Sequence, residues 1–304
     1  MLKFRNKGLF LLAVAIGVLT SGCTVQTKKT TMEATQQETR VIKTEQGEIE
    51  IPANPQRVIV TYCLGDALAL GVKPVATFDP TGIAYEQELE DIPVWEKFEA
   101  EQLIAYEPDL FIVVNQEQYD IASKIAPTIL LNFRELSMEE RVLFMGEILN
   151  RQEEAASALK EFNLKLEEAR TALAGKSILE KTFSIIESDG NSRIWVYGEK
   201  YGRGGDLLYG SLGFHAPEIV EKEIIAGEQY REVSMEVIND YIGDYIIISW
   251  GLNELNGNKI WESLPAVKKG NVISVDFNFF FYNDIYSSNV QLDYLMDALL
   301  KTQE

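Results

Sequence analysis

An internal repeat constrains the fold of this 304-residue chain more than any other feature of its sequence. Residues 101–113 read EQLIAYEPDLFIV and residues 236–248 read EVINDYIGDYIII. Glu, Tyr and Asp occupy matching positions in the two segments, and an apolar run follows the Asp in both. Each segment is typical of a short helix, a Pro or Gly break and a buried parallel strand. The repeat therefore predicts two α/β lobes of similar construction.

The residues that precede the first repeat alternate between strand-like and helix-like patterns. Residues 57–61 form a β-branched run, and residues 66–70 are typical of a helix that Gly71 closes in the left-handed conformation. Residues 72–76 resume an extended path because Pro74 cannot continue a helix. Alternating elements of this kind predict an α/β fold with parallel sheets and crossover helices.

A long helical stretch separates the two halves of the chain. Ser137 and Glu140 form a capping-box pattern at its start, and Gly175 is suited to end it. A weak point near Asn150 splits the stretch and leaves a second helix over residues 152–174, which is roughly 35 Å long at about 1.5 Å per residue. We predict an N-terminal α/β lobe over residues 40–136, linking helices over residues 137–174 and a C-terminal α/β lobe over residues 175–304.

The N-terminus has the layout of a secretory signal. A basic stretch (residues 3–7) precedes an apolar run (residues 8–19) that is shorter than the roughly 20 residues needed to span a bilayer. The small residues before Cys23 resemble a bacterial lipobox, in which the cysteine thiol accepts a lipid anchor; cleavage that leaves Cys23 unmodified is the alternative. We predict a signal peptide over residues 1–22, and a polar, flexible tether over residues 23–39 that follows the lipid anchor on the outer face of the cell membrane.

Composition excludes some partners and leaves one cysteine unpaired. The formal net charge of −19 argues against nucleic acid and against a polyanion bound on a broad basic surface, and solubility explains the acidity. Cys63 has no disulfide partner if Cys23 carries lipid, so we expect Cys63 to be a small buried apolar residue.

The sequence offers little for catalysis or for binding a bare metal ion. His215 is the only histidine, no nucleophile elbow accompanies it, and its position suggests a helix end whose dipole it complements. The glycine-rich residues 201–205 lack the Lys and the Ser or Thr of a P-loop. A single histidine also argues against a zinc or manganese carrier. We therefore predict neither an enzyme nor a direct metal ligand.

Aromatic residues gather around one arginine instead. Arg203 lies between Gly202 and Gly204, where a flexible turn would let its guanidinium approach a ligand oxygen. Iron-bound hydroxamate oxygens are electron-rich and can accept two hydrogen bonds from one guanidinium, and aromatic walls suit the apolar linkers of such a ligand. A structural ion pair is the alternative role for Arg203, and core packing is the alternative for Trp195, Phe279 and Phe281. The candidate contacts around this arginine are Trp195, Tyr197, Tyr201, Phe280 and Tyr282.

Several motifs together resemble the iron-siderophore substrate-binding lipoproteins of bacterial ABC importers, in particular the ferric-hydroxamate branch. The resemblance extends from Val41 to the C-terminus. It is carried by residues 61–74 (TYCLGDALALGVKP), 106–110 (YEPDL), 125–128 (IAPT), 201–205 (YGRGG), 264–267 (LPAV) and 282–284 (YND).

The resemblance implies a monomer with two Rossmann-like lobes joined by a long rigid helix, with the ligand cleft between the lobes. It implies that Arg203, Tyr201 and Tyr282 hold an iron(III)–siderophore complex, with no further cofactor. The family's permease-docking glutamates match Glu101 and Glu236, although a carboxylate at a helix start has the simpler role of complementing the dipole. Tyr62, Phe78 and Trp95 are the candidate contacts from the N-terminal lobe.

The chain departs from the hydroxamate branch in ways that leave the ligand open. Hydroxamate binders commonly have Trp where Tyr201 stands, and an aromatic pair richer in Trp or Tyr where Phe280 and Phe281 stand. A ferric catecholate, haem or cobalamin carrier of the same fold is the alternative, although a catecholate complex would favour more basic residues than Arg203 alone. A surface esterase that uses His215 and a structural adhesin are the more distant hypotheses.

Overall fold

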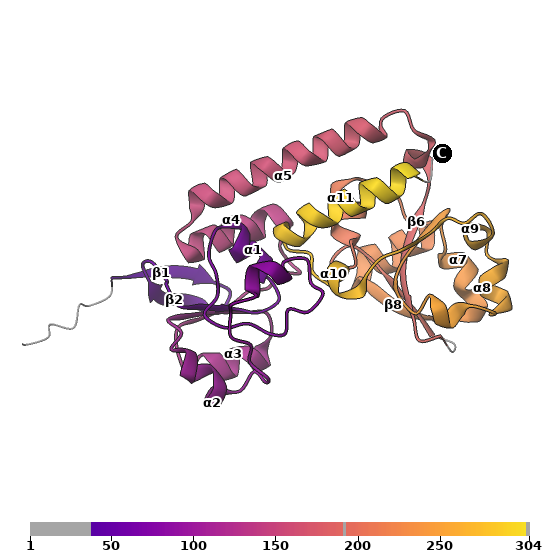
Figure 1. The fold of residues 1–304 in the computed structure, drawn as a ribbon. Coiled ribbons are helices and arrows are strands. Elements are labelled where there is room, and N and C mark those ends of the chain that lie inside the picture. The colour runs from indigo at the N-terminus through magenta and orange to yellow at the C-terminus, as the bar shows by residue number, and fades with distance from the viewer. Residues whose placement is uncertain (1–37, 191–192, 302–304) are drawn as a thin grey trace, which may run out of the picture. The chain divides into compact units, whose positions relative to one another are not determined.

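The computed structural model describes residues 38–190 and 193–301, which have an α/β fold (Figure 1). The described residues belong to one compact unit. Within the described ranges no helix combines the length and the apolar character that crossing a membrane requires. The predicted signal peptide, Cys23 and the tether up to residue 37 lie outside the described residues, and the first strand begins at Thr39.

The N-terminal half contains a hairpin and a short parallel sheet. The strands of the hairpin are β1 (Thr39–Thr44) and β2 (Gly47–Pro52). The sheet has the order β3 (Val58–Val60), β4 (Leu110–Val113), β5 (Thr128–Leu130), and its residues are buried except for half-buried Leu130. Burial on both faces is expected of a parallel sheet covered by helices. The surrounding helices are α1 (Leu64–Ala69), η1 (Glu86–Leu89), α2 (Ala100–Leu103), η2 (Ile104–Tyr106) and α3 (Gln116–Ala122).

The C-terminal half is built on a five-stranded mixed sheet with the order β10-β9-β6-β7-β8. Its strands are β6 (Phe183–Ser188), β7 (Arg193–Tyr197), β8 (Tyr230–Ser234), β9 (Tyr245–Trp250) and β10 (Val272–Ser274). β10, β9 and β6 are parallel, whereas β7 and β8 pair antiparallel. The predicted parallel arrangement is therefore wrong for β7 and β8. Residues 189–192 alone separate β6 from β7, which is too short a connection for a parallel crossover.

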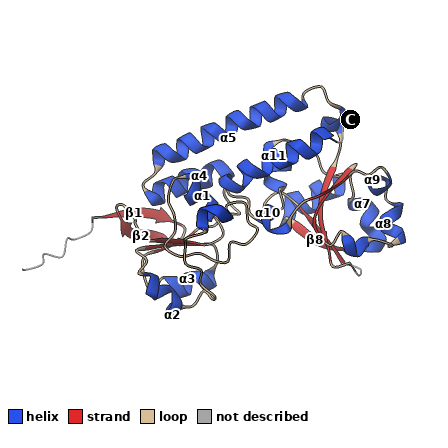
Figure 2. Ribbon diagram, in the orientation of Figure 1, coloured by secondary structure: helices blue, strands red, loops and turns tan. Residues whose placement is uncertain are grey.

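Helices accompany this sheet, and Figure 2 shows α7, α8 and α9 together on one side of it. The α-helices are α6 (Glu218–Val220), α7 (Ile238–Tyr241), α8 (Lys259–Ser263), α9 (Pro265–Lys268), α10 (Phe277–Phe281) and α11 (Ile285–Lys301). The shorter or wider helical turns are η3 (Ser177–Glu180), η4 (Asp206–Ser211), η5 (Glu221–Glu228), η6 (Met235–Val237) and η7 (Asn253–Leu255).

The sequence repeat corresponds to a structural repeat. In the first copy α2 and η2 lead into β4, and in the second copy η6 and α7 lead into β9. The matching aspartates also have matching roles. Asp109 accepts hydrogen bonds from the backbone N–H groups of Gln56 and Arg57, just before β3, and Asp244 accepts one from Thr182, just before β6. Each aspartate thus ties its own strand to the start of the neighbouring parallel strand.

The linking helices are close to their predicted positions. α4 (Met138–Leu149) begins with the predicted capping box of Ser137 and Glu140. Asn150 has a φ of 56° and separates α4 from α5 (Gln152–Leu173). α5 packs against α1, α4 and α11, and near its end Arg170 donates a hydrogen bond to the backbone oxygen of Ser211 in η4. This helix therefore contacts elements that belong to both halves of the chain (Figure 1).

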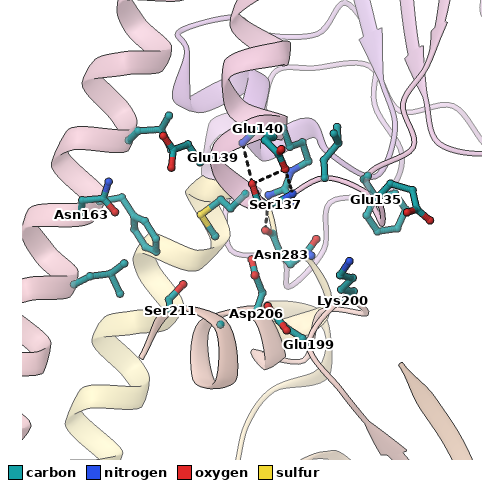
Figure 3. A pocket seen from close by; sticks show the side chains of 18 of the residues that line it. Glu135, Ser137, Glu139, Glu140, Asn163, Glu199, Lys200, Asp206, Ser211 and Asn283 are labelled. Atoms are coloured by element: carbon teal, nitrogen blue, oxygen red, sulfur yellow. Dashed lines mark hydrogen bonds between the residues drawn. The ribbon is translucent and has the colours of Figure 1, made fainter. Parts of the chain in front are cut away.

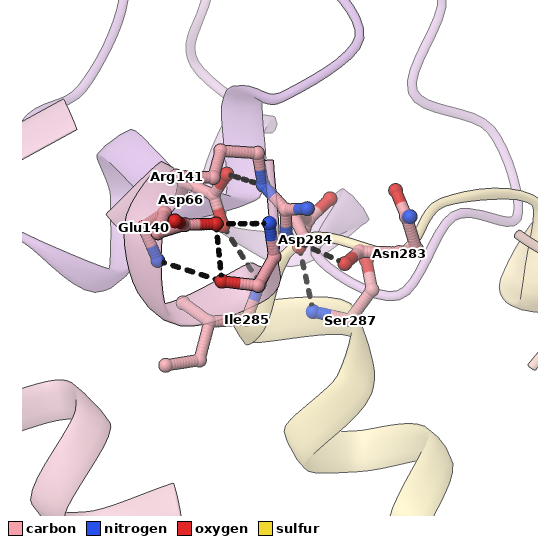
Figure 4. Close-up of polar contacts among 8 residues, drawn as sticks. Asp66, Glu140, Arg141, Asn283, Asp284, Ile285 and Ser287 are labelled. Atoms are coloured by element: carbon pink, nitrogen blue, oxygen red, sulfur yellow. Dashed lines mark hydrogen bonds and ion pairs between the residues drawn. The ribbon is translucent and has the colours of Figure 1, made fainter. Parts of the chain in front are cut away.

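A buried charge cluster joins α1, α4 and the start of α11 (Figure 4). Arg141 Nε lies 2.6 Å from Asp66 Oδ2, and its Nη2 donates to the backbone oxygen of Asn283 at 2.8 Å. The other oxygen of Asp66 accepts from the N–H of Ile285 at 2.8 Å. Burial, together with the nearby charge of Asp66, raises the pKa of Asp284 to about 7. Cys63, which precedes α1, is buried as predicted.

Candidate functional site

The carboxyl ends of the parallel strands carry some of the polar and aromatic side chains of the candidate site, and the others lie on or after the antiparallel strand β7. Tyr62 follows β3, Arg134 follows β5, Glu187 lies near the end of β6 and Trp250 ends β9. In α/β sheets, ligands bind outside the carboxyl ends of the strands. The topology therefore predicts a binding site at this edge of both sheets.

Arg203 lies on a tightly packed turn and not on a flexible one. Its φ is 57°, and the flanking Gly202 and Gly204 have φ values of 68° and 80°. A Cβ on Gly202 would lie 1.9 Å from the backbone oxygen of Phe281. The N–H of Arg203 donates to the oxygen of Phe280 at 2.6 Å. The glycines therefore allow the turn to press against α10, and this packing holds Arg203 in place.

The guanidinium of Arg203 forms an ion pair with Glu187, with 2.9 Å between Nε and Oε1. Both side chains are largely buried, at 12% and 5% exposure. Glu187 also accepts hydrogen bonds from Tyr197 Oη at 2.7 Å and from Ser249 Oγ at 2.8 Å. The rings of Tyr197 and Phe281 lie 4.7 and 4.6 Å from Arg203 Cζ. Arg203 is thus a cation that lies between two aromatic rings, and the carboxylate of Glu187 compensates its charge.

Glu187 is a site residue that the sequence analysis missed. It follows four residues of β6 that are all buried, and it is buried as well. A carboxylate near the carboxyl end of a buried strand needs a partner, because an unpaired buried charge is costly. That signal would have identified Glu187 as the partner of a cation. Burial and the hydrogen bond to Glu187 also raise the pKa of Tyr197, which keeps its phenol neutral.

Tyr201 connects the turn that carries Arg203 to the segment after β5. Its hydroxyl accepts a hydrogen bond from Arg134 Nη1 at 2.9 Å, and Arg134 Cζ lies 5.1 Å from the centre of its ring. Lys200 Nζ donates to the backbone oxygen of Arg134 at 2.8 Å. Arg134 was not singled out from the sequence, although its position just after a parallel strand could have indicated it. These contacts add two cations beside the site.

An aromatic cluster adjoins Arg203, and Tyr62 and Tyr282 are its centre. Tyr62 lies 4.6 Å from Phe133 and 5.1 Å from Tyr282 between ring centres, and Tyr282 stacks on Phe78 at 5.6 Å. Burial raises the pKa values of Tyr62 and Tyr282. A depression of about 430 Å³ opens beside the cluster. It is lined by Asp79, Thr81, Ile83, Phe277, Asn278, Phe281 and Tyr282.

Two predicted ligand contacts are core residues in the structure. Phe280 is 0% exposed, and its ring packs against Tyr294 at 5.5 Å. It turns inward on α10, where a Cβ on Gly204 would lie 3.2 Å from its ring. Trp95 is 8% exposed and packs edge-on against Phe98 at 5.8 Å in a separate apolar cluster. Phe280 and Trp95 are therefore buried in this conformation, as is Tyr197, which is also 8% exposed, and their contact with a ligand stays a prediction.

The remaining predicted site residues are exposed to different degrees. Trp195 is half-buried and stacks on Trp250 with 6.2 Å between ring centres. Glu101 and Glu236 are exposed in the first turns of α2 and η6. His215 caps no helix, contrary to the prediction: it lies between η4 and α6, and its Nδ1 is 3.2 Å from a Glu221 carboxylate oxygen.

A second cavity, of about 580 Å³, lies next to α4 and α5 (Figure 3). Carboxylates of Glu135, Glu139, Glu199 and Asp206 line it, and burial raises the pKa of Asp206 to about 6. Neither Arg203 nor the tyrosines of the aromatic cluster contribute to its wall. The same wall also carries Arg141, Arg170 and Lys200, but its carboxyl groups outnumber these cations. Because an excess of negative charge does not suit electron-rich ligand oxygens, we place the candidate site at Arg203 and the aromatic cluster.

Comparisons with known proteins agree on one family. The family model described as periplasmic binding protein matches residues 71–279. The iron(3+)-hydroxamate-binding protein YxeB of Bacillus subtilis (strain 168) is 32% identical over 281 residues, which cover 88% of this chain and 87% of that protein. The iron(3+)-hydroxamate-binding protein FhuD of the same strain is 29% identical over 314 residues, with 98% of each chain covered.

Solved structures have the same fold. A FhuD fold-family protein from Bacillus subtilis superposes with a TM-score of 0.77 and 28% sequence identity, covering 86% of this chain and all of that one. It is described as the periplasmic binding protein component of a Fep/Fec-like ferrichrome ABC transporter.

Proposed function

The chain belongs to the periplasmic binding protein family, and from this premise we propose that it is the substrate-binding component of an ABC importer that captures a ferric hydroxamate siderophore. The observation that carries the proposal is the charge-compensated Arg203–Glu187 pair between aromatic faces. The pair itself is balanced in charge and combines hydrogen-bond donors with a large apolar area, and the cations of Arg134 and Lys200 lie beside it. Those are the properties that suit a neutral or weakly charged complex with apolar linkers.

The proposed architecture has two Rossmann-like lobes, residues 40–136 and residues 175–304, joined by the linking helices over residues 137–174. The three-stranded and five-stranded sheets would be the cores of the lobes, with the ligand cleft at the carboxyl ends of their strands. The long helix α5 contacts elements from both halves of the chain, which supports a stiff connection.

In the proposed mode of binding, iron(III) remains chelated by the siderophore and receives no ligand from the protein. Arg203 would donate hydrogen bonds to the iron-bound oxygens, while Tyr62, Tyr197, Tyr201 and Tyr282 provide aromatic contact and phenol groups. No bond is made or broken in this mechanism, so the chain would act as a transport receptor and not as an enzyme.

Delivery to the membrane is the second half of the proposal. Lipid at Cys23 would hold the chain, as a monomer, at the outer face of the cell membrane. Exposed Glu101 and Glu236 lie at corresponding positions of the structural repeat, and they would dock on basic residues of two permease subunits. The repeat would thus supply one docking point from each half of the chain.

Titration of the intrinsic fluorescence tests the proposed ligand. The native chain is titrated with ferrioxamine, ferrichrome, a ferric triscatecholate and haem, each beside its iron-free form. We expect saturable, submicromolar quenching by a ferric hydroxamate. Tight binding of the triscatecholate or of haem alone would overturn the hydroxamate assignment, and no response to any of them would overturn siderophore capture.

Variants of the ion pair test the site. Removing Arg203 alone would leave Glu187 buried without a partner, so the variant combines Arg203→Met with Glu187→Gln. We expect this variant to fold and to bind the ferric hydroxamate at least about tenfold more weakly, which corresponds to about 1.4 kcal/mol. Arg151→Ala, at the junction of α4 and α5, is the control and should bind normally. Unchanged affinity in the double variant would contradict the role of Arg203.

A further inference from the structure

An irregularity in the pairing of β6 with β9 changes which face of the sheet Trp250 occupies. Ile186 pairs with Ile248, but the next residue, Glu187, pairs with Trp250, so that Ser249 is an extra residue in β9. Such a bulge bends its strand and redirects the side chains that follow, and bulges are common beside functional sites.

The bulge places Trp250 on the same face as the Arg203–Glu187 pair. In regular pairing Ser249 would lie opposite Glu187, and Trp250 would point to the other face. With the bulge, Glu187 has Trp250 as its neighbour on one side and Trp195 as its neighbour on the other. The two indole rings meet with 6.2 Å between their centres and 26° between their planes. We call Trp195 and Trp250 the indole platform.

The indole platform is apolar surface that the fold leaves exposed. Trp250 is 49% exposed, whereas the other residues of β9 are buried. Arg193 Cζ lies 5.3 Å from the centre of the Trp195 ring, so the guanidinium of Arg193, the ring of Trp195 and the ring of Trp250 follow one another. A rigid, exposed aromatic surface at the edge of a polar site is a typical contact area for an apolar part of a ligand.

We propose that the indole platform is a subsite for the aliphatic arms that join the hydroxamate groups of the ligand. This inference rests on the proposed function and extends it from the iron-bound oxygens to the periphery of the siderophore. Glu187 is the ion-pair partner of Arg203 and the cross-strand neighbour of both tryptophans, so the backbones of Trp195 and Trp250 lie about one strand spacing, roughly 4.8 Å, from that of Glu187. A ligand whose iron centre lies at Arg203 would have its arms within reach of the platform.

The indole N–H signals of the native chain test the contact directly. The gallium(III) complex of desferrioxamine B is a diamagnetic substitute for the ferric complex, and each tryptophan signal in a ¹H–¹⁵N correlation spectrum is assigned with a Trp→Phe variant. At saturation we expect the signals of Trp195 and Trp250 to shift, and that of Trp261, buried on α8, to stay in place. A stationary Trp250 signal in the saturated protein would overturn the subsite.

Affinity gives the second readout. Trp250 is exposed and lies at the end of its strand, so Trp250→Ala should fold and weaken ferrioxamine binding about tenfold. Ile260→Ala, which removes another exposed apolar side chain on α8, should change affinity less than about twofold. Equal affinities of Trp250→Ala and the native chain would refute the subsite and leave the proposed function intact. Failure of the native chain to bind any ferric hydroxamate would instead overturn the proposed function.

Discussion

At the scale of single residues, buried charge decides much of the behaviour of this protein. Two carboxylates and one guanidinium lie together in the cluster of Asp66, Arg141 and Asp284, so the cluster carries one negative charge in excess when all three groups are ionised. Burial disfavours that excess charge, and protonation of Asp284 removes it. The other buried pair, Arg203 and Glu187, is balanced and has no such excess.

The raised pKa of Asp284 predicts a pH-dependent stability. Between its ordinary pKa of 3.8 and its folded pKa of about 7, the folded chain keeps a proton that the unfolded chain releases. The stability of the native chain therefore falls as pH rises through this range. Asp284→Asn is neutral at every pH, so its stability relative to the native chain should rise by on the order of 2 kcal/mol between about pH 5 and about pH 8.

Urea denaturation followed by circular dichroism at both pH values measures this difference. Asp297→Asn, which changes an exposed carboxylate on the same helix α11, is the matched control for the loss of one carboxylate. If the free energy of unfolding changed with pH equally in Asp284→Asn and in the native chain, Asp284 would not be the cause of the pH dependence.

At the scale of elements, contacts between helices and their ends hold the two halves of the chain. The side chain of Asp284, just before α11, lies so close to α1 that a Cβ at position 65 would clash with its carboxyl group. α4 supplies Arg141 to the same place, and its own start depends on the capping box of Ser137 and Glu140. The starts of α4 and α11 thus position the side chains of the charge cluster.

Gly65→Ala tests the close approach of α1 to α11. The new Cβ would lie 1.8 Å from Asp284 Oδ1, so we expect a loss of about 3 kcal/mol in the free energy of unfolding. In an Asp284→Ala background the same change should cost much less, because the clashing carboxyl is gone. Additive losses in the double-mutant cycle would show that the two residues do not interact.

Ser137→Ala tests the start of α4. The serine side chain accepts the N–H of Glu140, and the Glu140 side chain accepts the N–H of Ser137, so the variant should lose about 1 kcal/mol in the free energy of unfolding. Ser157→Ala, in the second turn of α5 and exposed, is the control and should be nearly neutral. Equal stability of the two variants in chemical denaturation would contradict a stabilising cap.

At the scale of the whole molecule, the proposed function needs two independent surfaces. The site at Arg203 and the aromatic cluster would select the ligand, whereas Glu101 and Glu236 would bind the permease. Both glutamates precede strands of the structural repeat, and neither belongs to the aromatic cluster or the ion pair at Arg203. Ligand binding and transport should therefore be separable by mutation.

Combining Glu101→Lys with Glu236→Lys tests this separation. Reversed charge at both docking points should reduce uptake of the ferric siderophore by cells at least about tenfold, because opposite charges would become like charges at the interface. Affinity of the purified chain for the ligand should change less than about twofold. Glu168→Lys, exposed on α5, is the control for charge alone. Normal uptake by the double variant would rule out docking through these glutamates.

Local patterns in the sequence were sufficient for several elements of the fold, but not for the antiparallel pairing of β7 and β8. The capping box at Ser137, the break at Asn150 and the repeat of residues 101–113 and 236–248 all correspond to observed elements. These features depend on residues that are close in the chain, so their physical cause is visible in the sequence. The sequence also indicated Arg203 as a candidate site residue, because glycines flank it and aromatic residues are near it in sequence, whereas the structural ion pair was the alternative that the structure contains.

Tertiary structure alone decided which side chains of the site contact one another and which face of a sheet or helix each of them occupies. The pairing of Arg203 with Glu187, the reach of Arg134 to Tyr201 and the contact of Trp195 with Trp250 each join residues from different strands or connections. Burial of Phe280 depends on how α10 packs against the turn with Gly204. One extra residue in β9 decides the face of Trp250. Side-chain type and periodicity determine local structure, whereas register and packing between distant segments determine which side chains meet.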